Sequence, residues 1–184
     1  MMIVKPRNAV NDWEVYTPTT GAGNVLFLNT TDASTAASTV WNNTAPSSSV
    51  FTLGTNIRVN GSGTTYVGYL WSEIAGFSKF GSYTGNGSSP GPFVYTGFLP
   101  KFIMVKGTAT NRNWIMFDTT RSPYNTASAR LFANPSAAES TNEQVLFCSN
   151  GFQMTTYTFD GNANGETYIY MAFASNPFAQ SNAF

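Results

Sequence analysis

The stretch "DGNANGE", residues 160 to 166, has residue types and spacing that could bind calcium. It places Asp160, Asn162 and Asn164 at alternate positions before a glycine, which is how an EF-hand loop begins. The twelfth position, however, is Met171, where such a loop needs a bidentate Glu. A Gly/Asn-rich turn between strands explains the stretch better, because Asn and Gly tolerate positive φ. The three residues stand as a calcium candidate beside that interpretation.

Carboxylate pairs could hydrolyse glycosides if two of them lay about 5 to 10 Å apart. Asp118, Glu73 and Asp160 are available, but nothing in the sequence places two of them at that separation. The chain has no His, which excludes Ser-His-Asp and Cys-His arrangements and His-based metal sites. The single cysteine, Cys148, lies in the apolar run "VLFCSNGF" and is predicted to be a small core residue. We therefore predict no catalytic residues, no cofactor and no enzymatic activity.

An aromatic residue in a polar loop is the third candidate site. Trp41 lies in "STVWNNTAPSSS", and its ring could stack on a sugar or anchor a protein interface. Asn42 and Asn43 follow it and would supply polar contacts. Packing of Trp41 beneath the loop is slightly favoured over both of these roles.

The composition of the chain limits the kinds of partner that it is expected to bind. Charged residues make up only 10% of the chain, and nine basic and nine acidic side chains give a net charge of zero. Nucleic-acid binding needs clustered Lys and Arg, so it is not expected. The start of the chain lacks a signal-peptide pattern, and no segment has the ~18 apolar residues of a membrane span. We expect synthesis in the cytoplasm, no membrane insertion, and a surface of Ser, Thr, Asn and Gly that packs against other proteins.

The elements that would position these residues are short β-strands. Runs rich in Val, Ile, Phe, Tyr and Thr are separated by Gly, Pro, Asn and Ser at spacings typical of all-β proteins. Strands are predicted at 3–5, 13–17, 25–29, 50–53, 65–73, 79–83, 93–95, 102–106, 114–118, 130–134, 145–147, 152–155 and 167–174. The only candidate for a helical turn is "SAAESTNEQ", residues 136 to 144.

An internal repeat organises these strands. "IVKPRNAVNDWEVY" from Ile3 matches "MVKGTATNRNWIMF" from Met104, "LFLN" matches "LFAN", and "TYVGY" at 65 to 69 matches "TYIYM" at 167 to 171. We predict an antiparallel β-sandwich fold, Greek-key or jelly-roll-like, built from two copies of one unit at residues 1–77 and 78–184. The sequence leaves open whether they form one fused sandwich or two domains. The equivalent positions assign Trp13 and Trp114 to the core.

The two copies differ at their beginnings. The second is preceded by "FSKFGSYTGNGSSPGPFVYTGFLPKF", residues 77 to 102, which is interpreted as two strands around a Gly/Pro turn and contains the lead-in strands at 78–102. The first starts at Met1 without such a lead-in. The first copy is therefore expected to share strands with the second or to have an open edge near Met1 that another chain covers.

Several phrases carry a family resemblance. "GPFVYTGFLPKFIMVK", "NWIMFDTTRSPYN" and "NANGETYIYMAFASNPF" resemble the tandem β domain of virion and tail-associated proteins of marine tailed bacteriophages, including those of cyanobacteria. The resemblance is close over residues 65 to 178 and looser over 3 to 77. It implies a non-enzymatic structural role and supplies no catalytic residues.

Two functions follow from the resemblance together with the composition. The first is a small accessory protein on the virion surface, such as a capsid decoration protein or a tail-attached protein, that associates with other virion proteins or with itself. The second is a tail-fibre or receptor-binding adhesin that recognises host glycans. No heptad pattern or fibrous repeat is present to form a shaft, which favours the first.

Overall fold

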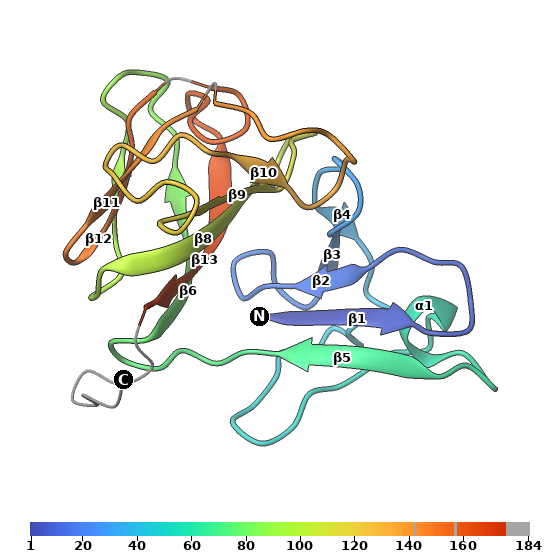
Figure 1. Cartoon of the computed structure of the whole chain (residues 1–184). Coiled ribbons are helices and arrows are strands. Elements are labelled where there is room, and N and C mark those ends of the chain that lie inside the picture. The colour runs from blue at the N-terminus through green and yellow to red at the C-terminus, as the bar shows by residue number, and fades with distance from the viewer. Residues whose placement is uncertain (142, 157, 176–184) are drawn as a thin grey trace.

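The chain folds into three antiparallel β-sheets, shown in Figure 1 as a computed structural model. The structure describes residues 1–141, 143–156 and 158–175. Within these ranges the strands are β1 to β13, and the α-helix is the single turn α1 (Ile57–Asn60). The prediction of an all-β antiparallel fold is confirmed at this level.

The first sheet has the order β4-β3-β2-β1-β5. Its strands are β1 (Met2–Pro6), β2 (Glu14–Tyr16), β3 (Asn24–Phe27), β4 (Thr35–Ala36) and β5 (Tyr66–Leu70). Successive side chains alternate between the two faces of a strand. Ile3 therefore faces one side of β1, while Met2 and Val4 face the other, and all three are buried. Burial on both faces explains why β1 is apolar almost throughout instead of alternating.

The second sheet has the order β10-β9-β8-β13-β6. Its strands are β6 (Ser78–Thr84), β8 (Pro100–Gly107), β9 (Ile115–Asp118), β10 (Leu131–Phe132) and β13 (Thr167–Ala174). β13 lies in the interior of the sheet and pairs with β6 on one side and β8 on the other. The third sheet, β11-β12-β7, consists of β7 (Phe93–Tyr95), β11 (Val145–Cys148) and β12 (Gly151–Met154).

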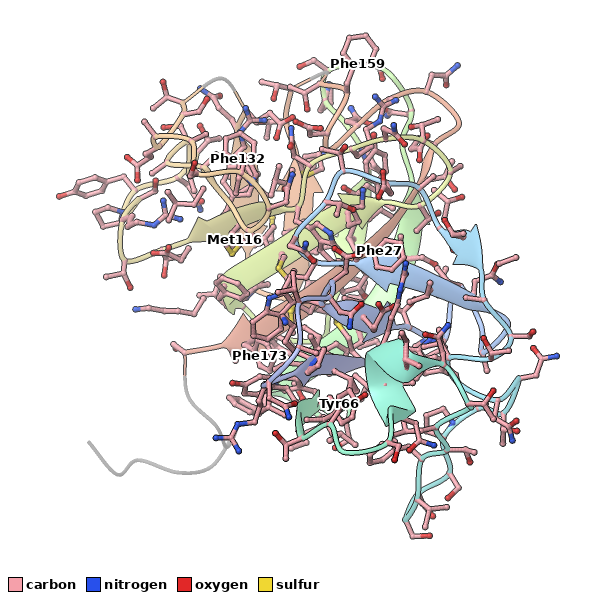
Figure 2. All side chains as sticks on the ribbon, turned by 90° about the vertical axis from the view of Figure 1, so that its right-hand side faces the viewer. Phe27, Tyr66, Met116, Phe132, Phe159 and Phe173 are labelled. Carbon is pink, nitrogen blue, oxygen red and sulfur yellow. The ribbon has the colours of Figure 1, made fainter. Side chains whose placement is uncertain are left out.

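Three buried clusters hold the sheets together as layers. The first and second sheets share a core that includes Ile3 and Leu26 from one sheet and Met104 and Met171 from the other. The outer face of the first sheet packs on the segment containing α1, and the outer face of the second packs on the third sheet. Figure 2 shows the side chains that fill these layers. The two predicted units therefore share one core along a face-to-face contact.

The first and second sheets have matching strand order and register. The order β3-β2-β1-β5 corresponds to β10-β9-β8-β13. The paired positions are Ile3 with Val15 and Tyr69 in the first sheet, and Met104 with Met116 and Met171 in the second. These are the residues that the internal sequence match places opposite one another.

Side-chain hydrogen bonds also recur at matching positions. The backbone N–H of Trp13 donates to Asn29 Oδ1 at 2.9 Å, and that of Trp114 donates to Asn134 Oδ1 at 2.9 Å. Each Asn thereby satisfies a backbone donor at the start of a strand. Trp114 is buried, in agreement with its predicted core role, whereas Trp13 is half-buried at the margin of the same cluster.

Matching tyrosines form a second recurrent contact. The Tyr66 hydroxyl donates to the carbonyl of Ile57 at 2.6 Å, and the Tyr168 hydroxyl donates to the carbonyl of Phe159 at 2.6 Å. In each case the tyrosine at the start of a long strand fixes the loop that leads into it. Both loops contain a glycine with positive φ, Gly63 at 69° and Gly165 at 74°, as the turn interpretation requires.

Several local predictions are wrong. Residues 50–53 form no strand, because in the described part of the chain the first sheet has no counterpart of the third sheet for them to join. The described residues of 136–144 are not helical, and Ser140 instead forms an isolated bridge with Arg130. The Gly/Pro-rich stretch at 85–92 is not a hairpin turn, since β6 and β7 belong to different sheets. The two-residue β4 and the single turn of α1 were not predicted.

Candidate interaction surface

β5 is an edge strand, although its partner β1 lies inside the first sheet. Beyond its ends, the Arg7 N–H donates to the Thr65 carbonyl at 2.8 Å, and the Trp71 N–H donates to the Met1 carbonyl at 3.0 Å. The odd-numbered residues of this stretch therefore direct their backbone groups towards β1. The open edge predicted near Met1 is thus formed by β5, since β1 is paired on both sides.

The even-numbered residues of β5 point the other way. Hydrogen-bonding groups alternate in direction along an antiparallel edge strand, so those of Tyr66, Gly68 and Leu70 face away from β1. Within the described ranges, no strand pairs with this outer side. Gly68 and Leu70 are exposed. The result is a row of unpaired backbone donors and acceptors on an accessible edge.

β5 also lacks the usual protection of edge strands. Its sequence, "YVGYL", contains no charged residue and no proline. The edge of β6 is different. Its Phe80 N–H donates to Glu73 Oε1 at 3.3 Å, Lys79 pairs with Glu73 at 2.8 Å, and Ser78 forms a bridge with Ile74. Within the described ranges, the chain therefore covers residues 78–80 of the β6 edge and leaves the edge of β5 available.

An apolar pocket opens at the Leu70 end of β5. It has a volume of about 350 Å³, and its lining includes Tyr16, Val50, Phe51, Leu70 and Trp71. Val50 is 65% exposed and Leu70 is 52% exposed, which places accessible apolar area directly beside the strand. Adjacent exposed apolar residues are typical of protein interaction sites.

A second exposed apolar residue lies near the other end of β5. Ile57, on α1, is 70% exposed, and its carbonyl accepts the hydrogen bond from Tyr66 described above. The backbone of Ile57 is thus joined to the Tyr66 end of the strand, although α1 contacts β1, and the pocket lies at the Leu70 end. We call the outer side of β5 together with Ile57 and the pocket the β5 surface.

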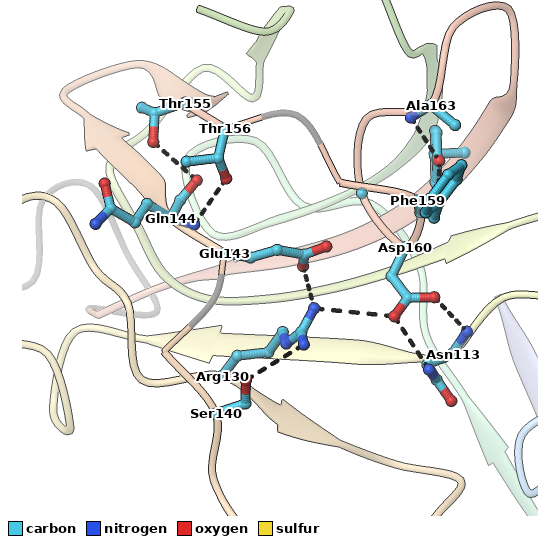
Figure 3. Close-up of polar contacts among 12 residues, drawn as sticks. Asn113, Arg130, Ser140, Glu143, Gln144, Thr155, Thr156, Phe159, Asp160 and Ala163 are labelled. Atoms are coloured by element: carbon cyan, nitrogen blue, oxygen red, sulfur yellow. Dashed lines mark hydrogen bonds and ion pairs between the residues drawn. The ribbon is translucent and has the colours of Figure 1, made fainter. Parts of the chain in front are cut away.

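A group of charged side chains surrounds Arg130 (Figure 3). Its Nη1 lies 2.8 Å from Glu143 Oε2 and 3.8 Å from Asp160 Oδ2. Asp160 also accepts hydrogen bonds from the backbone N–H and the side-chain Nδ2 of Asn113, at 2.9 and 3.0 Å. The Arg130 guanidinium stacks 4.6 Å from the centre of the Phe132 ring. Four segments of the chain are joined at this one cation.

The chemistry open to the Arg130 cluster is limited by burial. The Glu143 side chain is fully buried, and that of Arg130 is 9% exposed. Burial raises the pKa of Glu143 to about 7, opposed by the adjacent Arg130. A perturbed carboxyl is often functional. Here the buried groups are ones a substrate cannot reach, so the arrangement favours a structural cross-link.

Comparison with known proteins gives one match. A family model described as a domain of unknown function, DUF7483, matches residues 1–177. The chain belongs to the DUF7483 family. Searches of curated proteins and of solved structures give no match. The match includes every described strand, so the family model covers both the β5 surface and the Arg130 cluster of this DUF7483 domain. The described part of the domain contains no helix long and apolar enough to cross a membrane.

The structure distinguishes the two interpretations of Trp41. Its side chain is fully buried in the DUF7483 domain and packs edge-to-face on Tyr16, with ring centres 6.0 Å apart. The ring is therefore inaccessible to a sugar or a partner, and packing under the loop is the correct alternative. Asn42 and Asn43 are exposed, both with a φ of 52°, a conformation that Asn tolerates. Their role as ligand contacts stays a prediction.

The calcium candidates have other partners in the DUF7483 domain. Asp160 belongs to the Arg130 cluster, and Asn164 is exposed. Asn162 is fully buried, accepts from the Asn86 N–H at 2.9 Å and donates to the Ser88 carbonyl at 2.8 Å. Across the described ranges, no three His, Cys, Asp or Glu side chains gather as a metal site would need. The geometry favours a structural turn.

The remaining candidates also have local roles. Glu73 pairs with Lys79, and Asp118 accepts hydrogen bonds from the backbone and side chain of Arg121 at 2.8 and 2.6 Å. Cys148 is only half-buried near the end of β11, so its predicted core position is wrong.

Sequence reasoning missed Lys106, which is fully buried. Its Nζ donates to the carbonyls of Thr31 at 2.7 Å and Arg112 at 2.6 Å, which joins a loop of the first unit to the second. A lysine within the apolar run "FIMVKG" was the available signal. The outward direction of Gly68 was also missed, because the direction of backbone groups depends on which strand β5 joins.

Proposed function

We propose that this protein is a non-enzymatic structural protein of a tailed phage virion, an accessory surface protein of the capsid or tail that works by protein association. The observation that carries the proposal is the outer side of β5, which is unpaired, uncharged and flanked by exposed apolar residues. Such an edge is a ready site for another chain. The phage context comes from the sequence resemblance.

Composition and site chemistry support the same function. The net charge of zero and the 10% content of charged residues suit a protein packed among others. The carboxyl of Glu143, whose pKa is raised, is buried against Arg130. This arrangement favours a structural role over a catalytic one. The glycan-binding adhesin has less support, because buried Trp41 cannot provide its aromatic platform.

We also propose that the fold is a duplicated Greek-key unit. Support comes from the equal order of β3-β2-β1-β5 and β10-β9-β8-β13, where the last strand of each set lies beside the first. The recurrent Trp–Asn and Tyr–carbonyl hydrogen bonds add side-chain support. Under this proposal, β6 pairs with the side of β13 that corresponds to the outer side of β5, where no described strand is paired.

Purified virions of the phage that encodes the chain provide the test. We expect mass spectrometry to detect the protein in particles after density-gradient purification, and cryo-electron microscopy to place its density on the capsid or tail exterior. Detection only in the infected-cell lysate would overturn the virion assignment. A glycan array provides the comparison for the adhesin, which requires saturable sugar binding.

A further inference from the structure

We propose that the outer side of β5 pairs with the same strand of a second copy, in a two-fold antiparallel junction. The inference rests on the proposed function, since it names the first partner of an association protein, and it can be tested on the isolated chain. It follows from the direction of the backbone groups, the placement of apolar residues and the charge of the strand.

The backbone of β5 is suited to pairing with itself. Its outward residues, Tyr66, Gly68 and Leu70, are symmetric about Gly68. A two-fold axis at Gly68 places it opposite its own copy and places Tyr66 opposite Leu70 of the second chain. Backbone donors and acceptors of both strands are then satisfied, and the interface is closed because the same patch is used on both sides.

The side chains near the two ends of β5 complement each other under this symmetry. Directly opposed residues of an antiparallel pair lie on the same face. Tyr66 is half-buried and Leu70 is 52% exposed, with the 350 Å³ pocket beside Leu70. The two-fold axis carries each end onto the other, so the exposed Leu70 of one chain lies beside Tyr66 of its partner on the same face. Pairing therefore covers apolar area of both chains.

Charge favours a second copy over a charged partner. β5 has no ionisable carboxylate, lysine or arginine, and the chain has a net charge of zero, so two copies approach without repulsion. Pairing β5 with residues 78–80 of β6 on another copy is opposed by Glu73, which already binds the Phe80 N–H and Lys79. The β5 strand of a second copy offers an uncharged edge of the same length.

Light scattering coupled to size-exclusion chromatography tests the junction. We expect the wild-type chain to approach twice its 19.9 kDa mass as concentration rises, and Gly68→Lys to remain at 19.9 kDa. A side chain fits at Gly68, because an added Cβ would meet only Leu70 Cδ1 at 3.7 Å. Val10→Lys, in a fully exposed loop, is the matched control and should dimerise like the wild type. Circular dichroism should give the same spectrum for all three proteins.

Disulfide trapping tests the register. In a Cys148→Ser background, Gly68→Cys should form a covalent dimer under mild oxidation, because directly opposed Cα atoms lie about 5.5 Å apart, within disulfide range. Leu70→Cys should not, because symmetric Leu70 residues are about 13 Å apart along the strands. Equal trapping at both positions, or none at Gly68, would overturn the two-fold register.

The outcomes separate the two proposals. A wild-type chain that stays monomeric at high micromolar concentration overturns the β5 junction, even if the protein is found on virions. A β5 dimer that is absent from purified virions overturns the virion function and leaves the junction intact.

Discussion

Trp114 donates its indole N–H to the carbonyl of Phe27 at 2.8 Å, across the contact between the first and second sheets. Both residues are buried, and they lie 87 positions apart in the sequence. A buried donor and acceptor are satisfied only while the two sheets stay packed. This bond therefore joins the two predicted units into one folded body.

Trp114→Phe should destabilise the protein by about 1–3 kcal/mol, because the Phe27 carbonyl loses its buried donor. Urea denaturation followed by circular dichroism measures the change. Trp13→Phe is the control, since the equivalent residue is half-buried and makes no such inter-sheet bond. The coupling role of the indole N–H would be contradicted if the two variants lost equal stability.

Trp41→Ala should cost about 3–5 kcal/mol of stability, as is typical for removing a large buried aromatic residue. Asn42→Gly should leave stability nearly unchanged, because glycine adopts the φ of 52° without strain. Thermal unfolding of both variants tests this difference. A Trp41→Ala protein with normal stability would restore the ligand-binding interpretation of that residue.

Lys106→Met should destabilise the chain by roughly 2–4 kcal/mol, because the carbonyls of Thr31 and Arg112 lose a charged donor. Lys5→Met offers the matched comparison. Lys5 occupies the equivalent position in the first unit, but it is half-buried and donates only to the neighbouring Pro6 carbonyl at 3.0 Å. We expect its loss to change the free energy of unfolding by less than about 0.5 kcal/mol. Comparable losses would contradict the anchoring role of Lys106.

Stability should decrease as pH rises from about 4.5 to 7. Burial raises the pKa of Glu14 from 4.5 to about 7, opposed by Arg58 and reinforced by Asp12, and burial likewise raises that of Glu143. Between the ordinary and raised values the folded state binds more protons than the unfolded state, so the free energy of unfolding falls with rising pH.

Glu14→Gln should reduce this slope. Glu14 is the sharper test, because its nearest cation, Arg58, is 3.6 Å away, whereas Arg130 lies 2.8 Å from Glu143. We expect its contribution to be roughly 2–3 kcal/mol across the range. Urea denaturation at several pH values measures it, and identical slopes for wild type and Glu14→Gln would rule it out.

The sequence was informative where hydrophobic runs and repeats determine structure. Matching phrases around Trp13 and Trp114 predicted strands in both sheets, because each phrase contains an apolar run of strand length, and the two sheets pair the matched positions in the same order. Burial of Trp41 could not be predicted from its polar neighbours, since the core of the first sheet extends to it through tertiary packing. The outward direction of the Gly68 backbone groups depends on the pairing of β5 with β1, and a local sequence pattern does not specify that pairing.

The central claim, that this protein associates through the outer side of β5, is tested most directly by amide hydrogen exchange. At dimer-forming concentration, the account predicts slow exchange at Tyr66, Gly68 and Leu70 in the wild type and fast exchange at Tyr66 and Leu70 in Gly68→Lys. The amides of Val67 and Tyr69, which face β1, should be protected in both. Equally fast exchange of the outward amides in both proteins would contradict the account.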